Sequence, residues 1–202
     1  MQERNKNFLV LGLILGVFLA FFLAGRFLVN VDELPRINKG TLIIPHVSID
    51  SLALTSDEGT PYTGADMAGQ WTMAYIAGDA CDTACKNGLF YLMRQLRLSL
   101  DRDATRVRRL IIHTAEADTD LREFLNNNVA GMYEAHGQRD VIEAALGEAM
   151  AGASPLHHIF IISPDGMIFL WYPTHADRDS TLLEADNIRD DLKRTLKGSA
   201  IG

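Results

Sequence analysis

The sequence predicts one α/β domain, a central mixed β-sheet with helices on both faces, behind a single N-terminal transmembrane helix. Three observations support this prediction: an uncharged apolar run near the start of the chain, strand-like and helical segments that alternate after residue 40, and two cysteines four residues apart where a strand gives way to a helix. A chain of 202 residues allows one domain and an appendage.

Composition narrows the function classes. Hydrophobic residues make up 48% of the chain, so the domain can bury a full core. The net charge is −7 and the pI is about 5.3, whereas nucleic-acid binders carry a basic surface for phosphates. We therefore expect no nucleic-acid partner. Neither a glycine-rich phosphate loop nor a Gly-x-Ser-x-Gly motif occurs, which argues against a nucleotide enzyme or a hydrolase.

The appendage is an apolar segment close to the N-terminus. Residues 8–25 contain no charge, and residues 27–29 extend the apolar run past Arg26. At a rise of about 1.5 Å per residue, this length is close to that of a bilayer crossing. We expect residues 8–29 to be a transmembrane anchor and residues 1–7 a short cytoplasmic tail. A cleaved signal peptide is the alternative, but its apolar core is usually shorter, roughly 7–15 residues.

The orientation of this anchor follows from the domain behind it. Lysines and arginines lie on both sides of the anchor, so their number does not determine which side faces the cytoplasm. A cysteine pair and a large domain after the anchor favour an oxidising compartment for that domain. We expect a single-pass protein of the bacterial inner membrane with its C-terminal domain in the periplasm. Residues 30–40 are polar and read as a linker. The domain then occupies residues 41–202.

The first half of the domain is organised around the cysteines. Residues 41–54 alternate in part as a strand does, and Pro45 suits an edge position. Residues 55–70 are rich in glycine and read as a loop. A short apolar strand then starts at Trp71, turns at Gly78 and Asp79, and leads into a helix that ends near Ser99. We expect the first turn of this helix to contain both Cys81 and Cys85.

The second half of the domain supplies the remaining elements. Those expected are a strand at 107–114, helices at 119–128 and 140–150, a β-hairpin of 159–163 and 167–172 turning at Pro164–Gly166, and a final helix at 182–196. From the cysteine strand onward the order is β, α, β, α, α, β, β, α. This order, with a dithiol at the first strand-to-helix junction, is typical of a thioredoxin-like fold.

The cysteine pair is where we expect the chemistry. Thiols four residues apart at a helix start lie one turn from each other, and the helix dipole favours their thiolate form. Such a pair can close a disulfide, bind a soft metal ion or exchange electrons with a partner dithiol. Asp79 and Asp82 flank Cys81: their charge would raise a thiol pKa and stabilise a bound cation, or they cap the helix. A structural disulfide, or two buried cysteines, is the plain alternative.

Three motifs give the chain a more specific resemblance. They are Gly-Gln-Trp at 69–71 followed by Cys-Asp-Thr-Ala-Cys-Lys at 81–86, Thr-Ala-Glu-Ala-Asp-Thr at 114–119, and His-His-Ile-Phe-Ile-Ile-Ser-Pro-Asp-Gly at 157–166. Over residues 41–196 the chain resembles the Sco/SenC family of membrane-anchored, thioredoxin-like proteins that assist cytochrome c oxidase assembly. The family pattern has Gly-Lys-Trp and Cys-Pro-x-x-Cys-Pro at the first motif. Both motif prolines are replaced here, by Asp82 and Lys86.

The resemblance implies a copper site. Its ligands here would be Cys81, Cys85 and either His157 or His158, since soft thiolates with one imidazole suit Cu(I), and Cu(II) in a more tetragonal arrangement. Adjacent strand residues point to opposite faces, so only one histidine can face the dithiol. His157 is the better candidate, because a two-residue shift against the family pattern keeps its side chain on the same face.

Three functions remain open from the sequence. The favoured one is copper delivery to the copper centre of an oxidase, with a cytochrome c oxidase subunit or another assembly factor as partner. The second is thiol–disulfide exchange, with Cys81 as nucleophile and Cys85 as resolving thiol, although the usual redox spacing is Cys-x2-Cys. The third is an accessory protein with a static disulfide. The sequence thus leaves open whether the protein is an enzyme.

Overall fold

The structure, a computed structural model, describes residues 2–28, 37–117 and 119–199, with side chains of the first helix described from residue 12 to 25. It divides into two compact units, Met1–Ile37 and Asn38–Gly202. The end of the expected anchor and residues 30–36 of the expected linker lie outside the described residues.

The first unit contains one helix, α1 (Gln2–Leu28), which includes the uncharged run. Its described leucine, isoleucine, valine and phenylalanine side chains are 46–75% exposed. Within the described residues, no helix combines the length and the apolar character that a membrane crossing requires.

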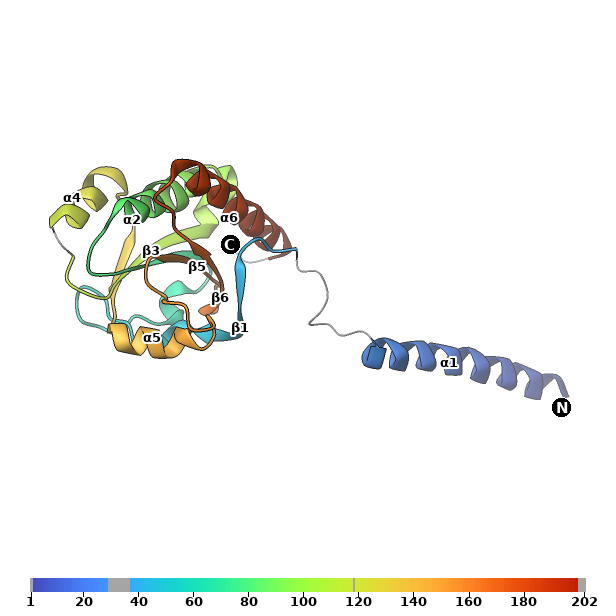
Figure 1. The fold of residues 1–202 in the computed structure, drawn as a ribbon. Helices are drawn as coiled ribbons and strands as arrows, with labels where there is room; N and C mark the ends of the chain where they lie inside the picture. Colours follow the sequence, from blue (N-terminus) through green and yellow to red (C-terminus); the bar gives the residue numbers. More distant parts are fainter. Residues whose placement is uncertain (1, 29–36, 118, 200–202) are drawn as a thin grey trace. The chain divides into compact units, whose positions relative to one another are not determined.

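The second unit is built on a six-stranded mixed sheet (Figure 1). In spatial order the strands are β1 (Thr41–Ser48), β6 (Met167–Pro173), β5 (His158–Ile162), β2 (Trp71–Ala77), β3 (Val107–His113) and β4 (Tyr133–His136). Strands β2, β3 and β4 run parallel, whereas β5 is antiparallel to β2 and to β6, and β6 is antiparallel to β1. The predicted mixed sheet is confirmed, and Pro45 lies on an edge strand as expected.

Helices cover both faces of the sheet, as predicted (Figure 1). One face packs against a continuous helical segment, here called the cysteine helix, and against two further helices. These elements are α2 (Thr83–Asn87), the π-helix η4 (Gly88–Gln95) and α3 (Leu96–Leu98), which together form the cysteine helix, and then α4 (Thr119–Asn128) and α6 (Arg178–Gly198). The other face packs against α5 (Arg139–Gly147) and the 3-10 turn η2 (Ile49–Leu52). Two more 3-10 segments are η3 (Gly64–Met67) and η5 (Asp101–Arg106).

The central strand β2 shows why both faces are covered. After Trp71 every residue of the strand is buried, with Met73 and Tyr75 on the cysteine-helix face and Ala74 and Ile76 on the opposite face. A run that is apolar on both faces is typical of a strand in the middle of a layered α/β sheet. This burial places the carboxyl end of β2 at a rigid position. The loop that contains Cys81, residues 78–82, starts there and is here called the cysteine loop.

Several elements differ from the sequence expectation. The strand expected over residues 41–54 ends at Ser48, and the 3-10 turn η2 follows it. Strand β4 was not expected, because only Ala135 of its four residues is buried and no alternation shows. Helix α5 begins one residue earlier and ends three residues earlier than expected. Helix α6 begins four residues earlier, because the Asp177 side chain accepts a hydrogen bond from the Ser180 N–H and caps it.

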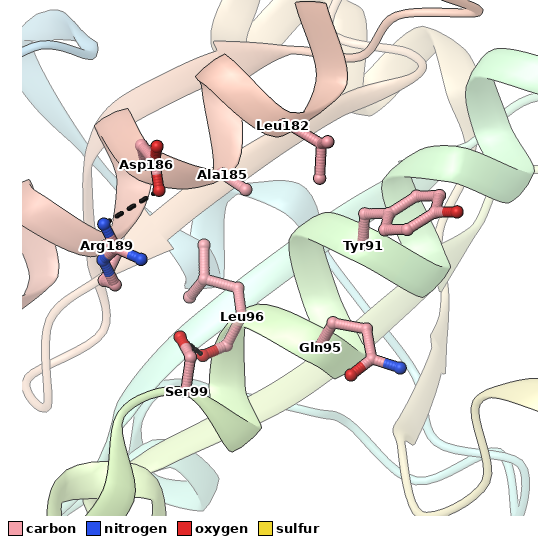
Figure 2. A pocket seen from close by; sticks show the side chains of 8 residues that line it. All are labelled: Tyr91, Gln95, Leu96, Ser99, Leu182, Ala185, Asp186 and Arg189. Atoms are coloured by element: carbon pink, nitrogen blue, oxygen red, sulfur yellow. Dashed lines mark hydrogen bonds and ion pairs between the residues drawn. The ribbon is translucent and has the colours of Figure 1, made fainter. Parts of the chain in front are cut away.

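A shallow groove of about 330 Å³ separates the cysteine helix from α6 (Figure 2). Its apolar floor includes Leu96, Leu182 and Ala185, and an ion pair of 2.8 Å between Asp186 and Arg189 lies at its rim. Neither cysteine and neither of the two candidate histidines lines this groove.

Candidate functional site

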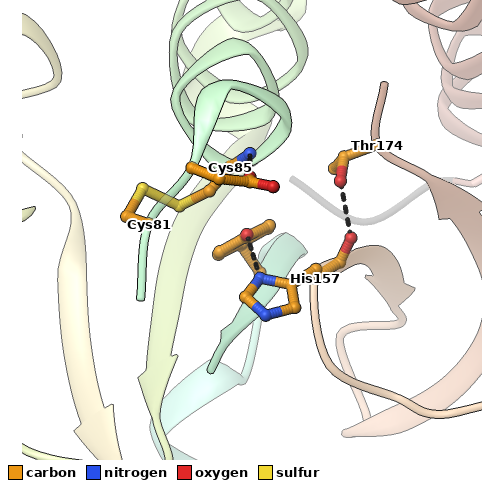
Figure 3. The surroundings of a disulfide bond; sticks show 6 residues. Cys81, Cys85, His157 and Thr174 are labelled. Atoms are coloured by element: carbon orange, nitrogen blue, oxygen red, sulfur yellow. Dashed lines mark hydrogen bonds between the residues drawn. A yellow bond between two sulfur atoms is a disulfide. The ribbon is translucent and has the colours of Figure 1, made fainter. Parts of the chain in front are cut away.

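The two cysteines form a disulfide at the carboxyl end of β2 (Figure 3). Their Cα atoms are 5.1 Å apart. Cys85 is buried, with 1% of its surface exposed, whereas Cys81 is only partly buried. The pair is therefore asymmetric: Cys81 keeps part of its surface exposed, whereas the core encloses Cys85.

The cysteine loop and helix meet at Asp82. Its side chain accepts a hydrogen bond of 3.0 Å from the Cys85 N–H, and its extended backbone makes it the N-cap of α2. The helix thus starts at Thr83, and the expectation that its first turn contains both cysteines is wrong for Cys81. Because Asp82 is the N-cap, Cys81 lies before the helix and only Cys85 lies in its first turn.

His157 lies on the same side of the sheet as the disulfide (Figure 3). Its Nδ1 is 3.0 Å from the hydroxyl of Tyr75. Its backbone is held at both ends: the N–H donates to the Ile76 carbonyl at 2.8 Å, and the carbonyl accepts from the Thr174 hydroxyl at 2.7 Å. Its φ of +61° is in the left-handed region, which is uncommon for a residue other than glycine.

Two glycines make this arrangement possible. A Cβ on Gly78 would lie 2.4 Å from His157 Nε2, and a Cβ on Gly88 would lie 2.7 Å from a methyl carbon of Thr174. Gly78 directly follows β2, and Gly88 starts the π-helical part of the cysteine helix. Gly78 thus makes room for the His157 ring, and Gly88 makes room for Thr174, whose hydroxyl bonds the His157 carbonyl.

His158 has a different environment. Its Nδ1 is 2.7 Å from the Leu156 carbonyl, and its ring packs edge-on against Trp171 at 4.7 Å. In β5 it shares a face with Phe160 and Ile162, which belong to the core opposite the cysteine helix. Burial lowers the pKa of His158, so the neutral imidazole is favoured there. The structure brings His157, and not His158, to the cysteine side of the sheet.

The two aspartates of the cysteine loop, Asp79 and Asp82, have different partners. Asp79 pairs with Arg139, at the start of α5, at 2.5 Å. The hydrogen bond from Arg139, its positive charge and, to a smaller extent, the charge of His157 lower the pKa of Asp79. Burial, followed by the charge of Asp82, raises the pKa of Tyr75, so its hydroxyl keeps its proton. Asp79 therefore forms a surface ion pair, and Asp82 is the aspartate that caps the helix.

A second histidine pair lies at the carboxyl ends of β3 and β4, the same end of the parallel strands from which the chain leaves β2 toward Cys81. His113 ends β3 with 2% exposure and contacts Glu134 at 2.9 Å. It stacks on His136, whose Nε2 is 2.7 Å from Asp57. Neither histidine contacts a cysteine.

The arrangement can do two kinds of chemistry. While both sulfurs are in the disulfide, no thiolate is available, and no group of three or more His, Cys, Asp or Glu in the described part of the chain is placed to hold a metal ion. Reduction would free two thiols, and a dithiol with one imidazole is a donor set that suits Cu(I). The same reduction is a two-electron exchange with another dithiol. The donor types fit copper, but the oxidised geometry does not assemble them.

The sequence reasoning missed the residues that hold His157. Tyr75 sits in an apolar strand, where a tyrosine reads as core, and Thr174 follows a strand with no motif around it. Gly78 was recognised only as a turn. Their roles depend on contacts over 82 and 17 residues of sequence separation, for Tyr75 and Thr174 respectively, which no local pattern encodes.

Comparisons with known proteins agree with the fold. Solved structures with the same fold include yeast Sco1 with copper bound (15% identity, TM-score 0.54, covering 82% of this chain and 97% of that one). Others are a thiol:disulfide interchange protein from Bacteroides sp. (14%, 0.50, 80% and 91%) and a SCO1/SenC family lipoprotein from Bacillus anthracis str. Ames (13%, 0.50, 80% and 97%). The predicted likeness to Sco proteins is thus confirmed for the fold.

The sequence itself identifies the family. No curated protein matches the chain. A family of domains described as "Transmembrane-like, thioredoxin-like, C-terminal domain" matches residues 71–199, which include the cysteine helix, the hairpin and α6. The chain belongs to this transmembrane-like, thioredoxin-like C-terminal domain family.

Proposed function

We propose that this protein is a Sco-like redox protein whose Cys81–Cys85 pair cycles between disulfide and dithiol during the biogenesis of a respiratory oxidase. The observation that carries the proposal is the asymmetry of the pair: partly exposed Cys81 is bonded to buried Cys85. In thiol–disulfide exchange the attacked sulfur must be accessible, and the leaving sulfur can be enclosed.

The exchange step balances as follows. A partner thiolate attacks Cys81 Sγ, a bond forms between the two chains, and the Cys81–Cys85 bond breaks with Cys85 leaving as thiolate. The partner's second thiolate then attacks its own sulfur in the mixed disulfide and releases the Cys81 thiolate. Two electrons pass from the partner dithiol to this disulfide, and the two new thiolates take up protons from solvent according to their pKa values. The reverse sequence oxidises this protein.

A trapping experiment tests this assignment. In Cys85→Ser, Cys81 remains accessible and should form a mixed disulfide with a dithiol peptide activated at one sulfur. In the matched Cys81→Ser variant, the buried Cys85 should react at least tenfold more slowly, because access limits the exchange rate. Mass spectrometry of the intact protein measures both rates. Equal rates would contradict the proposed roles of the two cysteines.

Copper delivery is the second candidate, and the position of His157 favours it. The reduced pair, with His157 as third ligand, would hold Cu(I) as cargo for a cytochrome c oxidase subunit or another assembly factor. Support comes from the donor types and from the shared fold with yeast Sco1, which was solved with copper bound. The sequence alternative His158 would have to leave its contacts with Leu156 and Trp171 to take part.

A competition titration separates the two candidates. The reduced protein is titrated with Cu(I) against a chelator, together with Cys81→Ser, Cys85→Ser, His157→Ala and the matched His158→Ala. Copper delivery predicts one-to-one binding that is lost in both cysteine variants and weakened in His157→Ala only. Binding no tighter than that of the chelator would reject copper as cargo and leave thiol–disulfide exchange as the function.

The proposal includes a membrane anchor. We infer that residues 8–29 hold the protein in the bacterial inner membrane with the domain in the periplasm, supported by the 18 uncharged residues from Phe8 to Gly25. Resistance of the full chain to alkaline extraction of membranes, and its loss on deletion of residues 2–28, tests the anchor. A reporter enzyme that folds only in the periplasm, fused after residue 40, tests the orientation.

A further inference from the structure

The two ring nitrogens of His157 have different surroundings. Nδ1 lies 3.0 Å from the Tyr75 hydroxyl. Nε2 faces the backbone at Gly78, where even a Cβ would approach it to 2.4 Å, and no hydrogen bond to Nε2 occurs within the described residues. One nitrogen is thus partnered and the other is unoccupied at the end of the strand from which the cysteine loop departs.

The direction of the hydrogen bond at Nδ1 follows from the burial of Tyr75. The ring has no exposed surface, and His157 Nδ1 is the hydrogen-bond partner of its hydroxyl in the described chain. A phenol has one proton to donate, and tyrosine carries it at neutral pH. If Nδ1 were the donor, the phenol proton would be left without an acceptor in the interior, which is costly. The hydroxyl therefore donates and Nδ1 accepts.

We propose that Tyr75 is a positioning residue that holds the His157 ring in the Nε2–H tautomer, so that the imidazole presents a proton donor, and not a lone pair, at the carboxyl end of β2. This inference rests on the proposed function and sharpens it. A metal ion needs the lone pair of a ring nitrogen. An N–H donor instead favours a negatively charged group.

Backbone hydrogen bonds hold His157 in place, so its ring stays next to Tyr75. Its N–H and carbonyl are both bonded, to Ile76 and Thr174, and a glycine makes room for the ring. To bind copper through Nε2 the ring must change tautomer, and the Tyr75 proton must then lose its acceptor. The tyrosine hydroxyl thus acts against metal binding at this histidine.

The first test reads the tautomer directly. Long-range ¹⁵N–¹H correlation NMR of the reduced, metal-free protein at neutral pH distinguishes the two forms, with His157 assigned by the spectrum of His157→Gln. We expect the Nε2–H pattern in the wild type and a mixture of both tautomers in Tyr75→Phe. A wild-type Nδ1–H pattern would overturn the proposal.

A matched variant controls for the loss of a buried hydroxyl. Tyr172 is also fully buried on the cysteine-helix face, but its hydroxyl bonds to Asp191 at 2.8 Å. Tyr172→Phe should leave the His157 pattern unchanged. If it shifts the pattern as much as Tyr75→Phe does, the effect is a general loosening of the core and the proposal is wrong.

The second test uses Cu(I) and a competing chelator. Tyr75→Phe should bind Cu(I) roughly tenfold more tightly than the wild type, because the cost of an unpaired hydroxyl disappears. The double variant Tyr75→Phe, His157→Ala should lose this gain. An unchanged or weaker affinity in Tyr75→Phe, where the wild type binds Cu(I), would contradict the proposal. If no variant binds Cu(I), copper delivery fails while the NMR result still decides the tautomer.

Discussion

Two buried tyrosines on the same face of the sheet show how a structural cluster differs from a candidate site. Tyr75 and Tyr172 both have fully buried rings, and each has a raised pKa, chiefly because of burial. Each cluster also depends on a glycine that admits a ring: Gly78 admits His157, and Gly40 admits the ring of Tyr172, 2.3 Å from where a Cβ would be.

The two clusters differ in what they leave unpaired. The Asp191 Oδ2 atom accepts hydrogen bonds from the Tyr172 hydroxyl and from the backbone N–H groups of Lys39 and Gly40, at 2.7–2.8 Å, and Oδ1 contacts Arg194 at 3.1 Å. That cluster ties the start of the domain to β6 and α6, and its carboxylate is fully partnered.

At the other tyrosine, Nε2 of His157 has no hydrogen-bond partner within the described residues, on the side of the sheet that carries the disulfide. Burial and hydrogen bonds alone are therefore a poor guide to function, since both clusters have them. What distinguishes the candidate site is a polar atom that the fold positions and leaves without a partner.

The largest expected effect breaks the structural cluster. Asp191→Ala removes the acceptor of one hydroxyl and two amides, and we expect it to lower the free energy of unfolding by about 3 kcal/mol. Urea unfolding measures this change. The reactivity of Cys81 toward a thiol reagent, measured on the folded, reduced variant, should stay at the wild-type value. A loss below about 1 kcal/mol would contradict the assigned role of Asp191.

The next prediction crowds the candidate site. Gly78→Ala places a methyl group against the His157 ring, so we expect a displaced imidazole and a stability loss of about 1–3 kcal/mol. The His157 NMR signals and urea unfolding report the two effects. Gly147→Ala is the control, because Gly147 ends α5 with nothing within 4 Å of its Cβ position. An unchanged His157 signal in Gly78→Ala would show that the ring does not depend on this glycine.

A smaller effect concerns the helix cap. Asp82→Ala should cost about 1 kcal/mol, because the Cys85 N–H loses its acceptor. Asp82→Asn keeps an acceptor of similar capping strength while removing the charge, so its stability should be near that of the wild type. Urea unfolding of the oxidised proteins compares the two. Equal losses in both variants would mean that the charge, and not the cap, matters at this position.

The smallest expected effect separates the two adjacent histidines. Because burial lowers the pKa of His158 in the folded state, the unfolded chain takes up a proton first as the pH falls below about 6.5. Stability is therefore lost as the pH falls from that value toward the folded-state pKa. In His158→Gln this component should be absent, so the unfolding curve should depend less on pH. An unchanged pH dependence would show that His158 is not a core histidine.

Local sequence patterns predict much of the domain. Where they fail, the failure has a physical cause. The predicted bounds of α4 are those observed, and the hairpin at Gly166, with a φ of +82°, has the expected turn. Strand β4 is short and exposed, so it has no periodicity to detect. Cys81 lies outside the helix because the next residue, Asp82, is the N-cap.

The candidate site shows the same limit. The spacing of Cys81 and Cys85 at a strand-to-helix junction was enough to propose the cysteine half of the candidate site from the sequence. The structure places His157, and not His158, on the cysteine side of the sheet, and the role of His157 as a ligand stays a prediction. Tyr75 could not have been found, because nothing in an apolar strand tells which buried tyrosine meets a histidine and which, like Tyr172, meets a carboxylate.

The reduction potential of the Cys81–Cys85 disulfide tests the central claim most directly. The full-length chain in mild detergent is equilibrated with glutathione or dithiothreitol redox buffers, and the reduced fraction is counted by mass spectrometry after alkylation. A redox-active pair predicts a potential above about −300 mV, within reach of cellular dithiols. A potential below about −300 mV would identify a structural disulfide and contradict the account.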